Sequence, residues 1–364
     1  MENLKIPFYA KITLIFIGLL AFISMLYIAQ SIIIPFIFSI IIAILLSPLV
    51  DFLVRKKMNR VLAIAFSLML VFIVVTLFVV LLSSKLNVFI ESFPNLLDKF
   101  YESLDHAVIW ASKYFSISTK SINLYIEDTK SEILNSSRAS IGATLTTVGS
   151  VLVIVFLIPV YIFLILFYQP LLLDFIRSLF EINNHKEVNE VLSSTKTIIQ
   201  RYLVGLLMEA AIIATLNSVG LLIIGIDYAI MLGILGALLN VIPYIGGIVA
   251  VALPMMVALL TKSSPVYALF VLILYIIIQF IDNNYIVSKL VASRVRINAL
   301  ISIMVVIIGG ALWGIPGMFL SIPLTAILKV IFDHIDALKP WGFLLGDTMP
   351  VITIFKLKLK TKQK

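Results

Sequence analysis

The chain has 364 residues, of which 62% are hydrophobic and only 13% are charged. Soluble domains are about half apolar and about a quarter charged, so lipid must be the solvent for much of this chain. The net charge of +8 comes without a basic cluster interleaved with aromatic residues, which argues against a nucleic-acid partner, and the lack of cysteine excludes disulfides and thiolate metal sites.

Apolar runs long enough for a membrane-spanning helix recur along the chain. A helix needs about 20 apolar residues to cross a bilayer. Six runs meet or nearly meet that length: 12–29, 32–50, 61–82, 147–168, 202–226 and 264–281. The first run lacks a signal-peptide cleavage site and leads straight into the second, so we expect an uncleaved helix. The sequence therefore predicts an all-α, polytopic integral membrane protein with about six full transmembrane helices.

Polar segments and a basic tail separate these runs. Segments 83–146 and 169–201 carry apolar residues at three- and four-residue spacing, which predicts amphipathic helices. The tail ends in alternating lysines that suit anionic lipid headgroups. We predict five parts: transmembrane helices 1–3 in 1–82, a polar helical insertion in 83–146, the fourth span with a cytoplasmic amphipathic helix in 147–201, a transport core in 202–331 and a basic tail in 332–364.

Two uncharged stretches, 228–260 and 299–328, are too long for one span, and each is broken in its middle by glycine and proline. Proline removes an amide donor and glycine loosens the helix, so backbone groups are freed within the bilayer. Such a break is stable only where it is buried in protein or lines a wet cavity. Each stretch is predicted to be a Gly/Pro-broken helical hairpin, either re-entrant or made of two tightly connected full spans.

The distribution of basic residues predicts the topology. Cytoplasmic loops are rich in Lys and Arg, and the basic loops fall on one side only if both hairpins return to the side on which they start. Both termini are then cytoplasmic and segment 83–146 is outside. Units 202–260 and 264–331 each consist of a span and a hairpin and run in opposite directions, so we hypothesise an inverted repeat.

Candidate site residues lie in this second half. Glu209 is the only acidic residue inside an otherwise apolar span, where charge is costly and desolvation favours the neutral form. It is interpreted either as a proton- or cation-coupling site or as an acid that snorkels towards water or is paired with Arg201, about two helical turns earlier. Asn217, on the same span, is interpreted as an interhelical hydrogen-bonding residue.

Polar groups also gather near the first break and at the end of span 264–281. Gln279, Asp282 and Asn283 could coordinate a hard cation or simply mark a helix end in water. Asn240 could cap freed carbonyls or face a solute. The breaks themselves could bind a polar solute or an ion through their backbone, and their candidate residues are Pro243, Gly246, Gly247, Gly309, Gly310, Gly314, Pro316 and Gly317.

Catalytic chemistry has little support in the sequence. His106, His185 and His334 lie far apart and outside the predicted spans. No acidic pair at catalytic spacing, phosphate-binding glycine loop or zinc-type ligand set is present. We therefore predict that the chain is not an enzyme and holds neither a metal nor a cofactor.

The two breaks carry a family resemblance. Ile242-Pro243-Tyr244-Ile245-Gly246-Gly247 with Pro254, and the later run from Gly309 to Met318 with Ile322-Pro323-Leu324, resemble the signatures of the autoinducer-2 exporter-like family of bacterial membrane proteins. The resemblance covers nearly the whole chain. It implies a transporter, some members being linked to autoinducer-2 and others to sodium- or lithium-for-proton exchange.

These observations lead to one expected function. We expect a transporter or exporter of a small polar solute or cation in the bacterial cytoplasmic membrane. We expect it to be coupled to an ion gradient such as H⁺ or Na⁺ through the two hairpins, and to form a homo-oligomer. A passive channel and an envelope scaffold protein are the alternatives.

Overall fold

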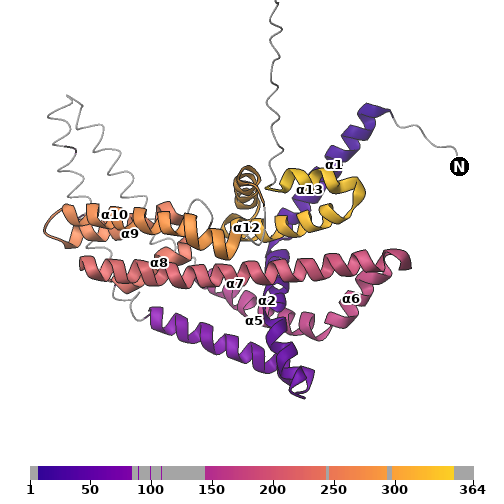
Figure 1. The fold of residues 1–364 in the computed structure, drawn as a ribbon, viewed down its shortest axis with the longest axis horizontal. Coiled ribbons are helices and arrows are strands. Elements are labelled where there is room, and N and C mark those ends of the chain that lie inside the picture. The colour runs from indigo at the N-terminus through magenta and orange to yellow at the C-terminus, as the bar shows by residue number, and fades with distance from the viewer. Residues whose placement is uncertain are drawn as a thin grey trace, which may run out of the picture.

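The computed structural model is helical in every regular element that it describes (Figure 1). The described residues are 7–83, 89, 99, 108, 144–242, 246–292 and 297–347. Within them, six helices are long and apolar enough to cross a membrane, or seven if one bent pair of helices is a single span. The predicted all-α polytopic fold is confirmed. Most of the insertion 83–146, Pro243, His106 and the tail beyond 347 lie outside the described residues.

The first three helices form an apolar N-terminal group. Helix α1 (Phe8–Ile28) has no buried residue and projects away from the other helices (Figure 1). Helix α2 (Gln30–Arg55) follows after Ala29, and a short basic loop leads to the helix Arg60–Ser83. Helix α5 (Thr144–Phe167) packs against α2, and the two share a small apolar core with the start of helix Arg60–Ser83.

Helix α7 (His185–Ile224) forms the centre of the molecule. Its 40 residues extend about 60 Å at 1.5 Å per residue. It follows α6 (Gln169–Ser178) and the short η1 (Ile182–Asn184), and it ends at Gly225, whose φ of 82° is the usual left-handed helix stop. Helices α2, α8, α10 and α12 all pack against α7 (Figure 1).

Helix α7 is continuous across residue 201, where the sequence analysis places a boundary between two parts of the chain. Segment 169–201 was predicted as a separate amphipathic helix and 202–226 as a span. In the structure the polar residues from His185 onwards and the apolar residues up to Ile224 belong to one helix. No proline occurs between these two positions, so nothing in the local sequence ends the helix where its polarity changes.

The first broken stretch folds into a hairpin, called hairpin 1 below, made of α8 (Ala229–Asn240) and α9 (Gly246–Thr261). Its arms pack together so closely that a Cβ added to Gly246 would lie 1.9 Å from the Leu239 carbonyl oxygen. At 1.5 Å per residue the arms are about 18 and 24 Å long, shorter than a hydrocarbon core of about 30 Å. Neither arm spans a bilayer without distortion.

The second broken stretch is also a hairpin, although it is assigned as one helix, α12 (Ala299–His334). The chain reverses at Gly314, whose φ of 63° and ψ of −144° are not helical. A Cβ on Gly317 would lie 1.9 Å from the carbonyl oxygen of Gly309, whereas residues eight apart in a straight helix are about 12 Å apart. Residues 299–313 and 315–334 are therefore the two arms of hairpin 2.

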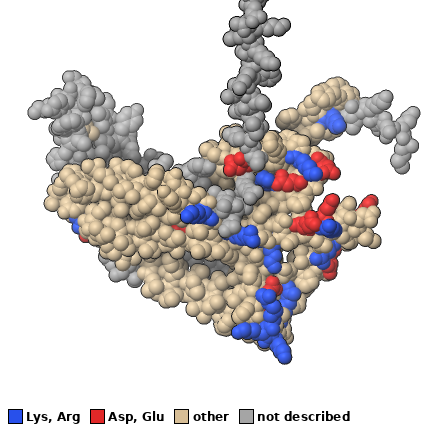
Figure 2. Space-filling model, viewed as in Figure 1, with Lys and Arg blue, Asp and Glu red and all other residues tan. Residues whose placement is uncertain are grey.

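Helix α10 (Val266–Ile281) connects the two hairpins and continues in π-helical form through η2 (Asp282–Ile286) and η3 (Ser288–Ala292). After hairpin 2 come η4 (Asp336–Leu338) and α13 (Lys339–Leu345). On the face shown in Figure 2, most charged side chains gather over α6, α13 and the loop after α2, and most of the remaining surface is uncharged. This separation is typical of a protein whose uncharged part lies in lipid.

Candidate functional site

One face of α7 carries polar side chains into the apolar interior. Glu209, Ile213 and Asn217 are spaced four residues apart and therefore lie on the same side of the helix. Only 6% of the surface of Glu209 and 2% of that of Asn217 is exposed. Ile213 packs between them against Ala237 of α8 and Ile278 of α10.

Helix α10 presents a matching polar face. Tyr275 and Asp282, seven residues apart, are both buried, with exposed fractions of 7% and 1%. Gln279 lies between them and is half-buried. The amide nitrogen of Asn240, at the tip of hairpin 1, donates a 2.9 Å hydrogen bond to Oδ2 of Asp282. The tip of the hairpin is therefore attached directly to a buried carboxylate.

These faces enclose a small cavity of about 10 Å³, which Asn217, Asn240, Tyr275 and Asp282 help to line. Three oxygen atoms of the lining side chains are fully buried and have no hydrogen-bond partner among the described residues: Asn217 Oδ1, Tyr275 Oη and Asp282 Oδ1. A buried polar atom without a partner is uncommon in folded proteins and calls for an explanation. Three around one cavity indicate a polar site rather than a packing defect.

Glycine allows the helices to approach each other here. A Cβ added to Gly236 of α8 would lie 3.2 Å from the Tyr275 hydroxyl and 3.3 Å from the Asn217 amide nitrogen. One added to Gly247 of α9 would lie 2.7 Å from Oε1 of Gln279. A larger residue at either position would push into the polar groups, so the absence of side chains keeps the site open.

Glu209 lies at the edge of this cluster. It is fifteen residues before the end of α7, and Asp282 is sixteen residues after the start of α10, so the two acids lie at similar depth in neighbouring antiparallel helices. Glu209 forms no ion pair with Arg201, which is exposed, within the part of the chain that the structure describes. The structure thus does not support the pairing with Arg201, and the coupling role of Glu209 stays a prediction.

The structure groups some of the predicted site residues and separates others. Asn240, Gly247, Gln279 and Asp282 lie together at the tip of hairpin 1, and Glu209 lies one helical turn before Ile213, which lines the same cavity. Gly246 packs on Leu239 within the same hairpin, and the exposed Asn283 accepts a 3.3 Å hydrogen bond from Gln279. The residues of the second break (Gly309, Gly310, Gly314, Pro316 and Gly317) form hairpin 2 and do not line this cavity.

Sequence reasoning missed Asn217, Tyr275 and Gly236 as site residues. The signal that could have found the first two is their helical spacing: Asn217 follows Glu209 by eight residues, and Tyr275 precedes Asp282 by seven. Both intervals are close to two helical turns and place a second polar group on the face of the acid. Gly236 carries no such signal, because its role depends on packing against two other helices.

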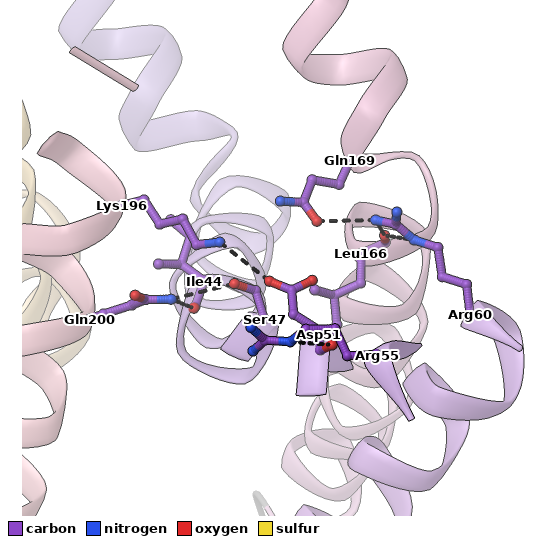
Figure 3. Close-up of polar contacts among 9 residues, drawn as sticks. All are labelled: Ile44, Ser47, Asp51, Arg55, Arg60, Leu166, Gln169, Lys196 and Gln200. Carbon is purple, nitrogen blue, oxygen red and sulfur yellow. Dashed lines mark hydrogen bonds and ion pairs between the residues drawn. The ribbon is translucent and has the colours of Figure 1, made fainter. Parts of the chain in front are cut away.

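A second polar cluster joins the N-terminal helices to α7 (Figure 3). Gln200 of α7 donates a 2.7 Å hydrogen bond to the Ile44 carbonyl, and Lys196 forms a 3.7 Å ion pair with Asp51. Arg60 donates to the Leu166 carbonyl at 2.7 Å and to Gln169 at 3.1 Å. Because Leu166 lies in the last turn of α5, Arg60 supplies a partner to a carbonyl that the helix itself leaves free.

No group of three or more His, Cys, Asp or Glu side chains that could hold a metal ion occurs within the described ranges. The polar cluster at hairpin 1 offers oxygen atoms instead, from two acids, three amides and a phenol. Such groups can exchange protons, hold a hard cation or hydrogen-bond a small polar molecule.

The chain resembles known transport proteins. It is 25% identical to the AI-2 transport protein TqsA of Escherichia coli K12 over 88% of this chain and 90% of TqsA. It is 23% identical to YhhT of the same strain, again over 88% and 90% of the two chains. Its match to YueF of Bacillus subtilis is 34% identical but covers only 37% of this chain and 36% of YueF.

The family profile described as AI-2E family transporter matches residues 15–337, which include both hairpins and the whole of the polar cluster. The match covers most of the chain and agrees with the resemblance carried by the two Gly/Pro breaks. The chain therefore belongs to the AI-2E transporter family.

Proposed function

We propose that the chain is an ion-coupled exporter of a small polar solute or cation and that Glu209 and Asp282 are its coupling acids. Membership of the family supports membrane transport in general. The observation that favours coupling is the position of the two acids, which are both buried and lie at similar depth in neighbouring helices of membrane-spanning length. An ionisable group inside a membrane-spanning helix is costly, so its presence there favours a role in moving protons or ions.

Hairpin 1 is the moving part in this proposal. Its tip holds Asp282 through Asn240, and its arms are too short to span a bilayer by themselves. Protonation of Asp282, or its binding of a cation, would weaken or redirect the bond from Asn240 and so release the tip. A change of charge at one acid would thereby be converted into movement at the solute path.

The test compares Glu209→Gln, Asp282→Asn and the control Glu187→Gln. Glu187 lies on α7 as well, but it is exposed and far from the apolar half. Flux of a panel of cations and small polyols into inverted vesicles is measured with and without a pH gradient. We expect the first two variants to lose the gradient-driven part of the flux by about tenfold or more, and the control to retain it. Gradient-dependent flux that survives in both variants would contradict the role of the acids, and large unitary currents would indicate a passive channel.

The setting of the proposed transporter is a bacterial cytoplasmic membrane, with both termini cytoplasmic and with several copies of the chain assembled together. Support for assembly comes from α1, which has no fully buried residue among its 21 and leaves most of its apolar side chains exposed. A homo-oligomer would cover part of that apolar surface, and lipid would cover the remainder. Sedimentation of the purified protein at several detergent concentrations tests the assembly separately from transport.

A further inference from the structure

The three unpartnered oxygens at hairpin 1 share one small space. Asn217 Oδ1 comes from α7, and Tyr275 Oη and Asp282 Oδ1 come from α10 and its π-helical extension. All three side chains are more than nine-tenths buried, and all three line the same cavity beside Gly236. Leaving these atoms without partners costs free energy at each of them. A single bound molecule that reached all three would remove the cost.

The chemistry of the three atoms restricts what can bind. A carbonyl oxygen and a carboxylate oxygen only accept hydrogen bonds, whereas a phenol both donates and accepts. The matching molecule therefore has at least two donors and one acceptor within a very small volume. A water molecule has this pattern.

The volume agrees with that identity. The cavity measures about 10 Å³, close to the roughly 10–15 Å³ that one water needs on the same measure, and buried waters typically make about three hydrogen bonds. A solute containing even two carbon atoms does not fit. The cavity as it stands is therefore not the binding site of the transported solute.

We infer that one structural water occupies this cavity, hydrogen-bonded to Asn217, Tyr275 and Asp282, and that it fastens α7 to α10 beneath the tip of hairpin 1. The other carboxylate oxygen of Asp282 accepts from Asn240. Hairpin tip, carboxylate, water and α7 then form one continuous chain of hydrogen bonds. The tip and Asp282 therefore cannot move together away from Asn217 of α7 unless this water is released.

Gly236 provides the test, because a side chain there projects into the cavity. In Gly236→Ala the methyl group occupies the place of the water and leaves the three oxygens unpaired, so we expect the melting temperature of the purified protein to fall by several degrees. In Gly236→Ser the hydroxyl group can replace some of the lost hydrogen bonds, so we expect part of that loss to be recovered.

Ala237, the next residue of α8, is the matched control. It is buried against Ile213 and Ile278, and it does not line the cavity. A serine there has no cavity oxygens to meet, so Ala237→Ser should lower the melting temperature. Replacing Ala by Ser is thus expected to raise the melting temperature at position 236 and to lower it at position 237. If the two changes in melting temperature have opposite signs, the gain at position 236 comes from the cavity, because a general effect of serine in a helix would have the same sign at both positions.

Two results would overturn the inference. A higher melting temperature in Gly236→Ala than in the unaltered chain would show a dry void that a methyl group fills. A melting temperature that rises in sodium or lithium chloride relative to choline chloride, and does so only when Gly236 is intact, would show a cation in place of the water. Thermal stability is measured without transport, so neither result depends on whether Glu209 and Asp282 couple transport to an ion.

Discussion

Gln200 compensates for a proline in a neighbouring helix. Pro48 of α2 has no N–H group, so the carbonyl of Ile44, four residues earlier, has no partner within its own helix. Gln200 of α7 donates to that carbonyl at 2.7 Å. An intrahelical bond is thus replaced by one between the N-terminal helices and α7 (Figure 3).

Removing this donor should destabilise the fold mainly while the proline is present. We expect Gln200→Leu to lower the free energy of unfolding by about 1–3 kcal/mol, since it leaves a half-buried carbonyl unpaired. In a Pro48→Ala background the new N–H restores the helical bond, so Gln200→Leu should then cost much less. Denaturant or thermal unfolding of the four proteins in this cycle measures the coupling. Equal costs in both backgrounds would disprove the compensation.

At the scale of single residues, the sequence predicted the acids of the site better than their partners. Glu209 stands out because it is an acid in an apolar span, and Asp282 because it ends one. Asn217 and Tyr275 carry no charge, and each is common in helices that pack against one another. Their importance comes from the approach of α7, α8 and α10 around Gly236, and that approach depends on packing between distant segments.

At the scale of elements, the two hairpins were predictable and the extent of α7 was not. Glycine and proline act locally, so the breaks near 243–247 and 309–317 could be predicted from the sequence. No Gly/Pro break separates the polar and apolar parts of α7, and an α-helix can continue from water into lipid. The sequence therefore did not predict that the two parts form one helix. The π-helical turns after Ile281 were likewise unpredicted, and the side chains of Asn284 and Ser288 bond to carbonyls there.

Hairpin 2 depends on the backbone conformation of Gly314. Its φ of 63° with a ψ of −144° is accessible almost only to glycine, although space for a Cβ is available. We expect Gly314→Ala to cost about 1–3 kcal/mol of stability through backbone strain alone. Unfolding can be followed by tryptophan fluorescence, because Trp313 is adjacent to the turn.

Gly18 of α1 supplies the control for that variant. A Cβ there also meets nothing within 4 Å, but the residue lies within a regular helix. Gly18→Ala should leave stability unchanged or raise it slightly, because alanine favours helix over glycine. If both variants behaved alike, strain at the turn would not be the reason for a glycine at position 314.

At the scale of the whole molecule, contacts of the polar insertion bear on topology. Phe89 packs against Tyr228 with ring centroids 5.5 Å apart, and Lys99 donates to the Leu260 carbonyl at 3.5 Å. Both partners lie at the end of hairpin 1 where α7 ends and α10 begins. Phe89 and Lys99 therefore lie on the same side as the open end of hairpin 1, which the charge distribution predicts to be the outside.

Single cysteines test this arrangement, because the natural chain has none. Ser263 lies in the exposed loop between α9 and α10, and Ser288 is exposed in the π-helical segment beyond α10. A membrane-impermeant maleimide should label Ser263→Cys in intact cells, and should label Ser288→Cys only after the membrane is opened. Labelling of Ser288→Cys from outside would reverse the predicted topology.

The bond between hairpin 2 and α1 has a consequence for how the protein is made. Trp313 donates a 3.1 Å hydrogen bond from its indole nitrogen to the Leu26 carbonyl, across a separation of 287 residues. At about 5–20 residues per second, the ribosome reaches Trp313 roughly 15–60 s after Leu26. Helix α1 is thus made well before the helix that supplies this partner. During synthesis α1 must therefore remain in lipid through its own apolar surface and its contacts with α2, and the bond that fixes its end forms only after hairpin 2 has been made.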